Sequence, residues 1–172
     1  MKTNLLLQRP ESLNGISVPT VRNLRESAII NKEFQAVLTA GPSQNECNWN
    51  HKNHRVWTFD DTSSLAWGGP EYDQVYEMIS WGAEQDDLLV HCHAGMSRST
   101  ATAWGVLIAK GADALDAFVA LMDAHPTEWQ HKRLFCPNRL LVEHIQEILG
   151  QPDLLEIREV MLKGDSRVQN WL

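Results

Sequence analysis

Long apolar runs and internal repeats are missing from this chain of 172 residues. The start of the sequence holds one apolar run, Leu5 to Leu7, which is shorter than the roughly 7–15 residues of a secretory signal. No segment approaches the roughly 18 uninterrupted apolar residues that a membrane span needs. These absences predict a soluble, cytoplasmic protein that does not associate with a membrane.

Basic residues are also few, because 15 Lys and Arg stand against 22 Asp and Glu, a formal net charge of -7. The longest run of Lys and Arg is the pair Lys132-Arg133. Clustered Lys and Arg supply most of a protein's affinity for a phosphate backbone, so no nucleic-acid partner is expected. A single focused positive site inside a negative protein can still attract an anionic substrate.

Cysteine is scarce, and the three residues Cys47, Cys92 and Cys136 are an odd number at wide spacing. This pattern argues against a disulfide framework and favours a reducing compartment. Cys136 is expected to be structural. Cys47 is expected to be exposed or packed in the core, with a disulfide to an oxidised Cys92 as the alternative. His51 and His54 lie near Cys47, and a surface loop is preferred there over a metal site.

The order of apolar segments and Gly or Pro residues predicts the fold. Strands are expected at 34–41, 55–59 and 88–92. Helices are expected at 70–85, 97–110, 112–124, 137–149 and 152–163. Strands alternating with helices, followed by helices only, predict an α/β fold with a central mixed sheet of about four or five strands and a helical C-terminal half. One domain over residues 1–172 is expected.

One segment of this predicted fold has the features of an anion site. Leu88 to Thr100, with the sequence LLVHCHAGMSRST, is expected to form a buried strand, a short loop and a helix. Backbone N–H groups at such a junction converge at the helix N-terminus, where the macrodipole adds roughly half a positive charge. Gly95 allows the tight curvature, and Arg98 can grip two oxygens of a tetrahedral anion. The phosphate-binding residues are therefore expected to be His93, Ala94, Gly95, Met96, Ser97 and Arg98.

Cys92 stands at the mouth of this predicted site, where the positive field favours the thiolate. A thiolate in front of a bound phosphate can attack phosphorus and form a phosphocysteine intermediate. Ser99 can donate a hydrogen bond to the sulfur, and His91 is expected to help order the loop. The leaving group then needs a proton, and the adjacent Asp60 and Asp61 are the candidates, of which one can face the site.

The string from His91 to Ser99, with its Cys-x5-Arg spacing, resembles the phosphate-binding signature of the cysteine-dependent protein tyrosine phosphatases. It is most similar to their dual-specificity branch. In that family a general acid precedes the cysteine, and its Asp-Thr pair resembles Asp61-Thr62 more than Asp60. Asn138, at the start of a predicted helix, resembles the family residue that supports the phosphate loop. The resemblance therefore implies the catalytic residues Cys92, Arg98, Asp61 and Ser99, with support from His91 and Asn138.

The activity that the resemblance implies is hydrolysis of phosphate monoesters, without metal or cofactor, on phosphorylated proteins or small monoesters. The resemblance covers about residues 35–149, and residues 151–172 are expected to form a helical extension beyond it. This extension is expected to pack on the core of a monomer, with self-association as the alternative. Phosphatases of non-protein phosphates (nucleotides, RNA ends, sugars or lipids) and a catalytically silent phosphate-binding module stay open. Trp67 is left open between lining the pocket and packing on the surface.

Overall fold

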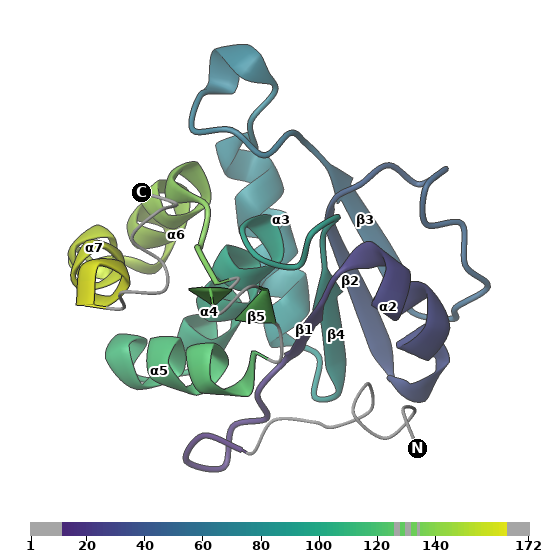
Figure 1. Ribbon diagram of the computed structural model, residues 1–172, viewed down its shortest axis with the longest axis horizontal. Helices are drawn as coiled ribbons and strands as arrows, with labels where there is room; N and C mark the ends of the chain where they lie inside the picture. Colours follow the sequence, from purple (N-terminus) through teal and green to yellow (C-terminus); the bar gives the residue numbers. More distant parts are fainter. Residues whose placement is uncertain (1–11, 126–127, 130–131, 134, 165–172) are drawn as a thin grey trace.

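A four-stranded parallel sheet forms the centre of the computed structural model, which describes residues 12–125, 128–129, 132–133 and 135–164 (Figure 1). Its strands lie in the order β1-β4-β2-β3. They are β1 (Thr20–Arg22), β2 (Ala36–Gly41), β3 (His54–Thr58) and β4 (Leu88–His91). The α/β class is confirmed, but all three pairings in this sheet are parallel, so it is not the mixed sheet that was expected. A short antiparallel pair, β5 (Glu128–Trp129) and β6 (Lys132–Arg133), is separate from it.

Helices cover both faces of the sheet, as parallel strands require (Figure 1). One face is covered by α2 (Leu24–Ile30) and the other by α4 (Arg98–Ala109), with further helices packed around α4. The latter are α3 (Tyr72–Ala83), α5 (Ala114–Ala124) and α6 (Arg139–Leu149). The last helix, α7 (Leu154–Gly164), packs against α6. Two short 3-10 turns, Asn31–Glu33 and Leu65–Trp67, complete the described elements.

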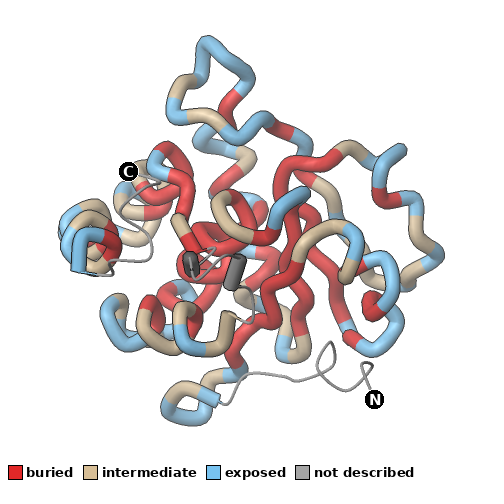
Figure 2. The backbone as a smooth tube through the Cα atoms, in the orientation of Figure 1, coloured by how far each residue is buried: buried red, intermediate tan, exposed pale blue. Residues whose placement is uncertain are grey.

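The main core lies between the sheet and α4. Eleven consecutive residues of α4, from Arg98 to Ile108, are buried (Figure 2). This burial explains why the segment is apolar on nearly every side of the helix. Trp104 in α4 and Trp57 in β3 both belong to this core, as expected. A smaller cluster under α2 contains Val37 and Leu89, because successive side chains of a strand face opposite sides.

The C-terminal helix α7 packs on the core through buried Leu154 and Leu162, which confirms the packing predicted for it. Arg158 adds a hydrogen bond from Nε to the Pro137 carbonyl at 2.6 Å. The last part of the predicted extension, 165–172, lies outside the described residues. Among the residues that the structure does describe, no helix combines the length and apolar character needed to cross a membrane.

Several boundaries differ from those predicted. Helix α3 begins at Tyr72, and its N-cap Glu71 forms a capping box with Gln74 in the first turn, so Pro70 precedes the helix rather than starting it. His54 is the first residue of β3 and not part of the preceding loop. β1 and α2 were not predicted at all, because their short segments lack a clear hydrophobic period. Trp67 is 77% exposed, which resolves its open placement in favour of the surface.

Candidate active site

The predicted anion site lies between the end of β4 and the start of α4. Cys92 follows β4 directly, and its side chain is buried. The backbone N–H of Gly95 donates to the Cys92 Sγ at 3.2 Å, and the Ser99 hydroxyl lies 3.1 Å from the same sulfur. The Gly95 N–H and the Ser99 hydroxyl therefore converge on one sulfur, and both can donate a hydrogen bond to it.

Position 95 requires a glycine, both because of its backbone conformation and because of the atoms that surround it. Its φ is +71°, and a Cβ at this position would lie 2.7 Å from backbone atoms of Arg22 and Asn23. The loop is tied to the same region by the Leu24 N–H, which donates to the His93 carbonyl at 3.0 Å. The junction of β1 and α2 thus forms one wall behind the phosphate loop.

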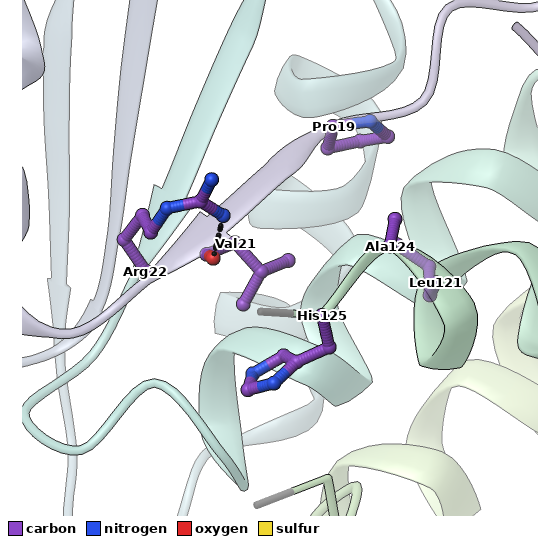
Figure 3. Close-up of a pocket in the computed structure, with 6 residues that line it drawn as sticks. All are labelled: Pro19, Val21, Arg22, Leu121, Ala124 and His125. Atoms are coloured by element: carbon purple, nitrogen blue, oxygen red, sulfur yellow. Dashed lines mark hydrogen bonds between the residues drawn. The ribbon is translucent and has the colours of Figure 1, made fainter. Parts of the chain in front are cut away.

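A small hollow between β1 and α5 lies against this wall (Figure 3). His125, at the end of α5, lines it and donates from Nε2 to the Gly95 carbonyl at 2.6 Å. Arg22 lines the same hollow and donates to the Val21 carbonyl at 2.7 Å. Nothing in the sequence pattern marks Arg22 or His125 as neighbours of the site, because both reach it through tertiary packing.

The other side of the loop is held by the segment that precedes α6. The N–H of Cys136 donates to the Met96 carbonyl at 2.8 Å, and the N–H of Asn138 donates to the Ser97 carbonyl at 3.0 Å. The Asn138 side chain caps α6 by accepting from the Leu141 N–H at 3.0 Å. Asn138 therefore fixes the loop to the start of a helix, the position that the sequence predicted for it.

Asp61, and not Asp60, faces the phosphate loop. Its Oδ1 accepts hydrogen bonds from the Ser97 hydroxyl and from Asn138 Nδ2, both at 2.8 Å. The Asp60 carboxylate instead lies against Gly68, and the Asp60 N–H donates to the Gly68 carbonyl at 2.7 Å. The structure therefore separates two adjacent carboxylates that the sequence could rank only by resemblance.

Arg98 connects the acidic segment to the loop. Its Nη1 donates to the Phe59 carbonyl at 2.8 Å, and its Nε lies 4.0 Å from Asp61 Oδ2. The guanidinium packs against Gly41, where any Cβ would overlap it. Within the described part of the chain, the buried Nε of Arg98 has no hydrogen-bond partner. A buried donor without a partner in the protein is suited to an oxygen of a bound anion.

His91 packs against Thr39 and Trp49 and contacts the start of the phosphate loop only at the Cys92 carbonyl. Its ring is fully buried, with Nε2 2.6 Å from the Thr39 hydroxyl and Nδ1 3.4 Å from the Cys92 carbonyl. Burial lowers the pKa of His91 from 6.5 to about 3, so the imidazole is neutral near pH 7. The side chains of His93 and Ala94 are exposed on the outer side of the loop.

No protein-family model matches this chain. No curated protein matches it either. Several solved structures are similar to it. Human DUSP28 is similar over 79% of this chain and 94% of its own, with 14% identity and a TM-score of 0.60. A putative dual specificity phosphatase from mouse is similar over 88% and 97%, with 15% identity and a TM-score of 0.56.

A third similar structure is Tk-PTP in its active form, which matches 79% of this chain and 92% of its own. The identity is 17% and the TM-score 0.52. At identities of 14–17%, these similarities show the fold alone. This chain has the fold of the tyrosine and dual-specificity phosphatases.

Proposed function

We propose that this protein is a cysteine-dependent phosphate monoester hydrolase of the dual-specificity type. The observation that carries the proposal is the link between two loops: Asp61 is hydrogen-bonded to Ser97, inside the loop whose Gly95 N–H and Ser99 hydroxyl surround the Cys92 sulfur. A nucleophile, groups that can donate to its sulfur and a carboxyl group are thereby held together beyond the carboxyl ends of the parallel strands β3 and β4. The fold shared with the dual-specificity phosphatases supports the same proposal.

In the first chemical step, the Cys92 thiolate attacks phosphorus and the bond to the leaving oxygen breaks. Asp61 gives its proton to that leaving oxygen. The backbone N–H groups of the loop and the Nε of Arg98, which has no hydrogen-bond partner among the described residues, bind the phosphoryl oxygens and stabilise their negative charge in the transition state.

In the second step, a water molecule attacks the phosphocysteine. Asp61, now a carboxylate, takes the proton of this water, and inorganic phosphate leaves. The sulfur departs as a thiolate, which the Ser99 hydroxyl stabilises from 3.1 Å. The step needs neither a metal nor an organic cofactor, because the residues named supply nucleophile, acid, base and anion binding.

The proposed substrates are phosphorylated proteins, with phosphotyrosine, phosphoserine and phosphothreonine all accepted. The Asp61 side chain is 40% exposed and the His93 side chain 48% exposed, so the rim of the site lies at the surface above the buried Cys92. We infer that short phosphorylated side chains reach the site as well as phosphotyrosine. We place this activity in the cytoplasm, where protein thiols are kept reduced.

The test is the initial rate of hydrolysis of p-nitrophenyl phosphate by reduced protein in the presence of EDTA. We expect turnover by the wild type and a loss of about 10⁴-fold or more in Cys92→Ser. Cys136→Ser is the matched control, because its thiol does not touch the nucleophile, and it should keep most of the activity. Appreciable turnover by Cys92→Ser would contradict the mechanism.

A folded, reduced wild type without turnover would also contradict the proposal. Binding of orthovanadate or tungstate by that inactive protein would then indicate a phosphate-binding module. Phosphopeptides with each of the three phosphorylated residues, compared with nucleotide and sugar phosphates at equal concentration, test the substrate class. Higher kcat/KM on the non-protein phosphates would replace the protein-phosphatase assignment.

A further inference from the structure

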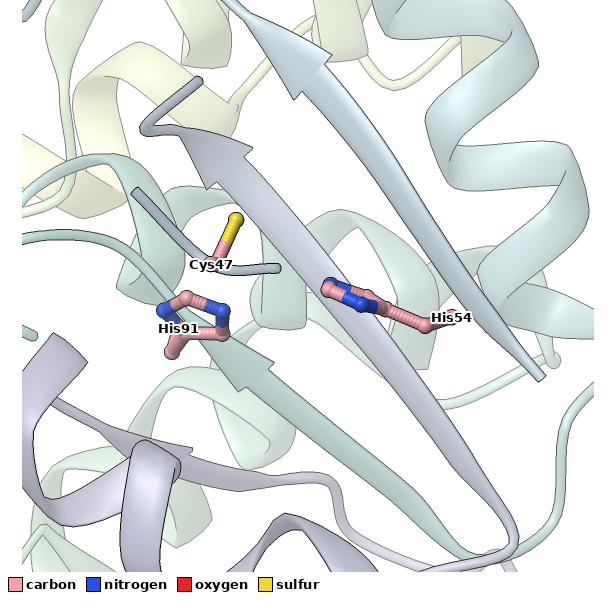
Figure 4. A group of neighbouring side chains, drawn as sticks. All are labelled: Cys47, His54 and His91. Atoms are coloured by element: carbon pink, nitrogen blue, oxygen red, sulfur yellow. The ribbon is translucent and has the colours of Figure 1, made fainter. Parts of the chain in front are cut away.

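A second group of reactive side chains lies beside the catalytic loop on the α2 face of the sheet. Cys47, His54 and His91 place one sulfur and two ring nitrogens within 4.8 Å of one another (Figure 4). Cys47 and His91 are fully buried, and His54 is partly buried. The three residues come from three separate segments, so no local spacing in the sequence marks them as a group.

The register of the sheet explains why they meet. Thr39 of β2 pairs with His91 of β4, and Val37, two residues earlier, pairs with His54 of β3. Residues two apart in a strand point to the same face, so both imidazoles stand on one side of β2. The segment that follows β2 then folds back over this face and brings Cys47 to it.

The Thr39 hydroxyl marks the point where the three side chains converge. Its Oγ1 lies 2.7 Å from His54 Nε2 and 2.6 Å from His91 Nε2, and it is also hydrogen-bonded to the Cys47 thiol. One hydroxyl thus touches all three potential ligand atoms. An ion at this position would replace the hydroxyl after rotation of the Thr39 side chain.

The chemistry of the group fits zinc. A cysteine thiolate and neutral imidazoles are ligands that Zn²⁺ binds in proteins, with bonds of about 2.3 Å to sulfur and about 2.0 Å to nitrogen. The Nδ1 of His91 faces the Cys92 carbonyl at 3.4 Å, which directs the other nitrogen toward Thr39. Trp49 covers both rings, with centroids 5.4 Å from His54 and 4.8 Å from His91.

We propose that Cys47, His54 and His91 form a binding site for Zn²⁺ that is separate from the phosphate loop. The ion forms bonds with Cys47 Sγ and with Nε2 of both histidines. Cys47 releases its proton to solvent, and any proton on a coordinating Nε2 moves to the Nδ1 of the same ring. Three protein ligands leave the fourth tetrahedral position to water. The ligand atoms lie up to 4.8 Å apart and must approach to about 3.5 Å to bind one ion. Small side-chain rotations of Cys47 and of His54, which lies on the edge strand β3, can provide this movement.

This site does not depend on the proposed phosphatase activity. It does, however, place an ion on the residue that directly precedes the nucleophile, since His91 is followed by Cys92. The test must therefore exclude Cys92 itself as a ligand. All measurements are made in a Cys92→Ser background, with metal-free protein and a reductant that binds metals weakly.

Cobalt is the probe, because Co²⁺ bound to a thiolate gives a near-ultraviolet charge-transfer band and tetrahedral Co²⁺ gives strong visible bands. We expect both bands to saturate at one equivalent of Co²⁺ and to disappear when Zn²⁺ is added. A further Cys47→Ser substitution should remove the charge-transfer band and weaken Zn²⁺ binding at least about 100-fold. His54→Gln should weaken binding to a similar degree while the band stays detectable at high Co²⁺.

Cys136→Ser in the same background is the matched control, because Cys136 is also a free cysteine but is only half-buried and faces Arg158 rather than histidine. It should leave both bands unchanged. Circular dichroism and the apo-protein Tm verify that each variant is folded. Folded protein that gives no bands at one equivalent, bands that survive Cys47→Ser, or bands lost in Cys136→Ser would each overturn the proposal.

Discussion

Cys92 and Cys47 are both buried beside the same sheet, yet the groups around their sulfur atoms differ. The Cys92 sulfur accepts from the Gly95 N–H and faces the Ser99 hydroxyl. The Cys47 thiol instead donates to the Ser43 carbonyl at 3.0 Å, and burial raises its pKa. Donors around a sulfur favour its thiolate, whereas a carbonyl acceptor favours the thiol.

The two environments are also built differently. The surroundings of Cys92 come mostly from residues within the same strand, loop and helix. Those of Cys47 come from three strands and a folded-back segment. Burial alone therefore does not predict which thiol is reactive; the polarity of the groups around each sulfur does. Four substitutions test this difference, beginning with the largest expected effect.

The proposed general acid, Asp61, is hydrogen-bonded to Ser97 in the loop that follows Cys92. Asp61→Asn should lower kcat on an alkyl or phenyl phosphate by about 10³-fold, because these leaving groups need a proton. On p-nitrophenyl phosphate, whose leaving group is stable without one, the loss should be less than about tenfold. Asp60→Asn is the matched control, since the carboxylate of Asp60 lies against Gly68. The opposite result for the two variants would assign the acid to Asp60.

His91 lies between the two thiol environments and should make the fold sensitive to acid. Burial holds its folded pKa at about 3, below the ordinary value of 6.5. As the pH falls below 6.5, the unfolded chain binds a proton that the native ring does not, so stability is lost. The expected loss is about 3 kcal/mol between pH 7 and pH 4.

The measurement is urea unfolding at several pH values in EDTA. Compared with the wild type, His91→Gln should show a shallower fall of the unfolding free energy with decreasing pH, whatever its stability at pH 7. The groups that face His91 are Thr39, His54 and Cys47, and the charge of His93 also opposes its protonation. Identical pH slopes for the two proteins would show that His91 does not titrate in this way.

Gly95 supplies one of the two donors to the Cys92 sulfur. Gly95→Ala combines a positive φ with a Cβ 2.7 Å from the backbone of Arg22 and Asn23, so we expect a loss of about 2–3 kcal/mol in stability. Gly111→Ala is the control, because Gly111 also has a positive φ but open space around it. It should cost only about 1 kcal/mol. Equal costs in chemical denaturation would mean that the contact with β1 and α2 is not tight.

Ser99 supplies the second donor, and its removal should give the smallest effect. Ser99→Ala leaves the loop in place but removes one hydrogen bond to the departing thiolate, so we expect a loss of about tenfold in kcat. The slower step should be breakdown of the phosphocysteine, seen as a larger burst of leaving group in rapid-mixing experiments. Ser97→Ala, which touches Asp61 instead of the sulfur, should lower the rate without a larger burst.

The local parts of the fold and of the site were predictable from the sequence. The apolar run from Leu88, the glycine at position 95 and the Cys-x5-Arg spacing specify a strand, a tight loop and a helix within thirteen residues. Short-range sterics and backbone hydrogen bonds decide such a unit, so neighbouring residues suffice to recognise it. The helix α7 was predictable for the same reason, since Leu154 and Leu162 lie on one face.

Other features depend on residues far apart in the chain. Asp60 and Asp61 are adjacent and of the same type, so the local sequence does not distinguish them. The structure distinguishes Asp61 through its hydrogen bonds from Ser97 and Asn138, which come from other segments. The short strand β1 forms because it pairs with β4, and no local sequence pattern predicts this pairing. Likewise, Arg22 and His125 reach the site through packing alone.

What the sequence by itself determined is the chemistry of one segment, where Cys92, Gly95, Arg98 and Ser99 are placed by consecutive backbone geometry. What only the tertiary structure decided is which distant groups surround that segment. Parallel strands are joined through long connections, so their register brings together residues such as Thr39, His54 and His91 that have no common local pattern. The proposed catalytic loop can therefore be recognised in the sequence, whereas the proposed zinc site beside it cannot.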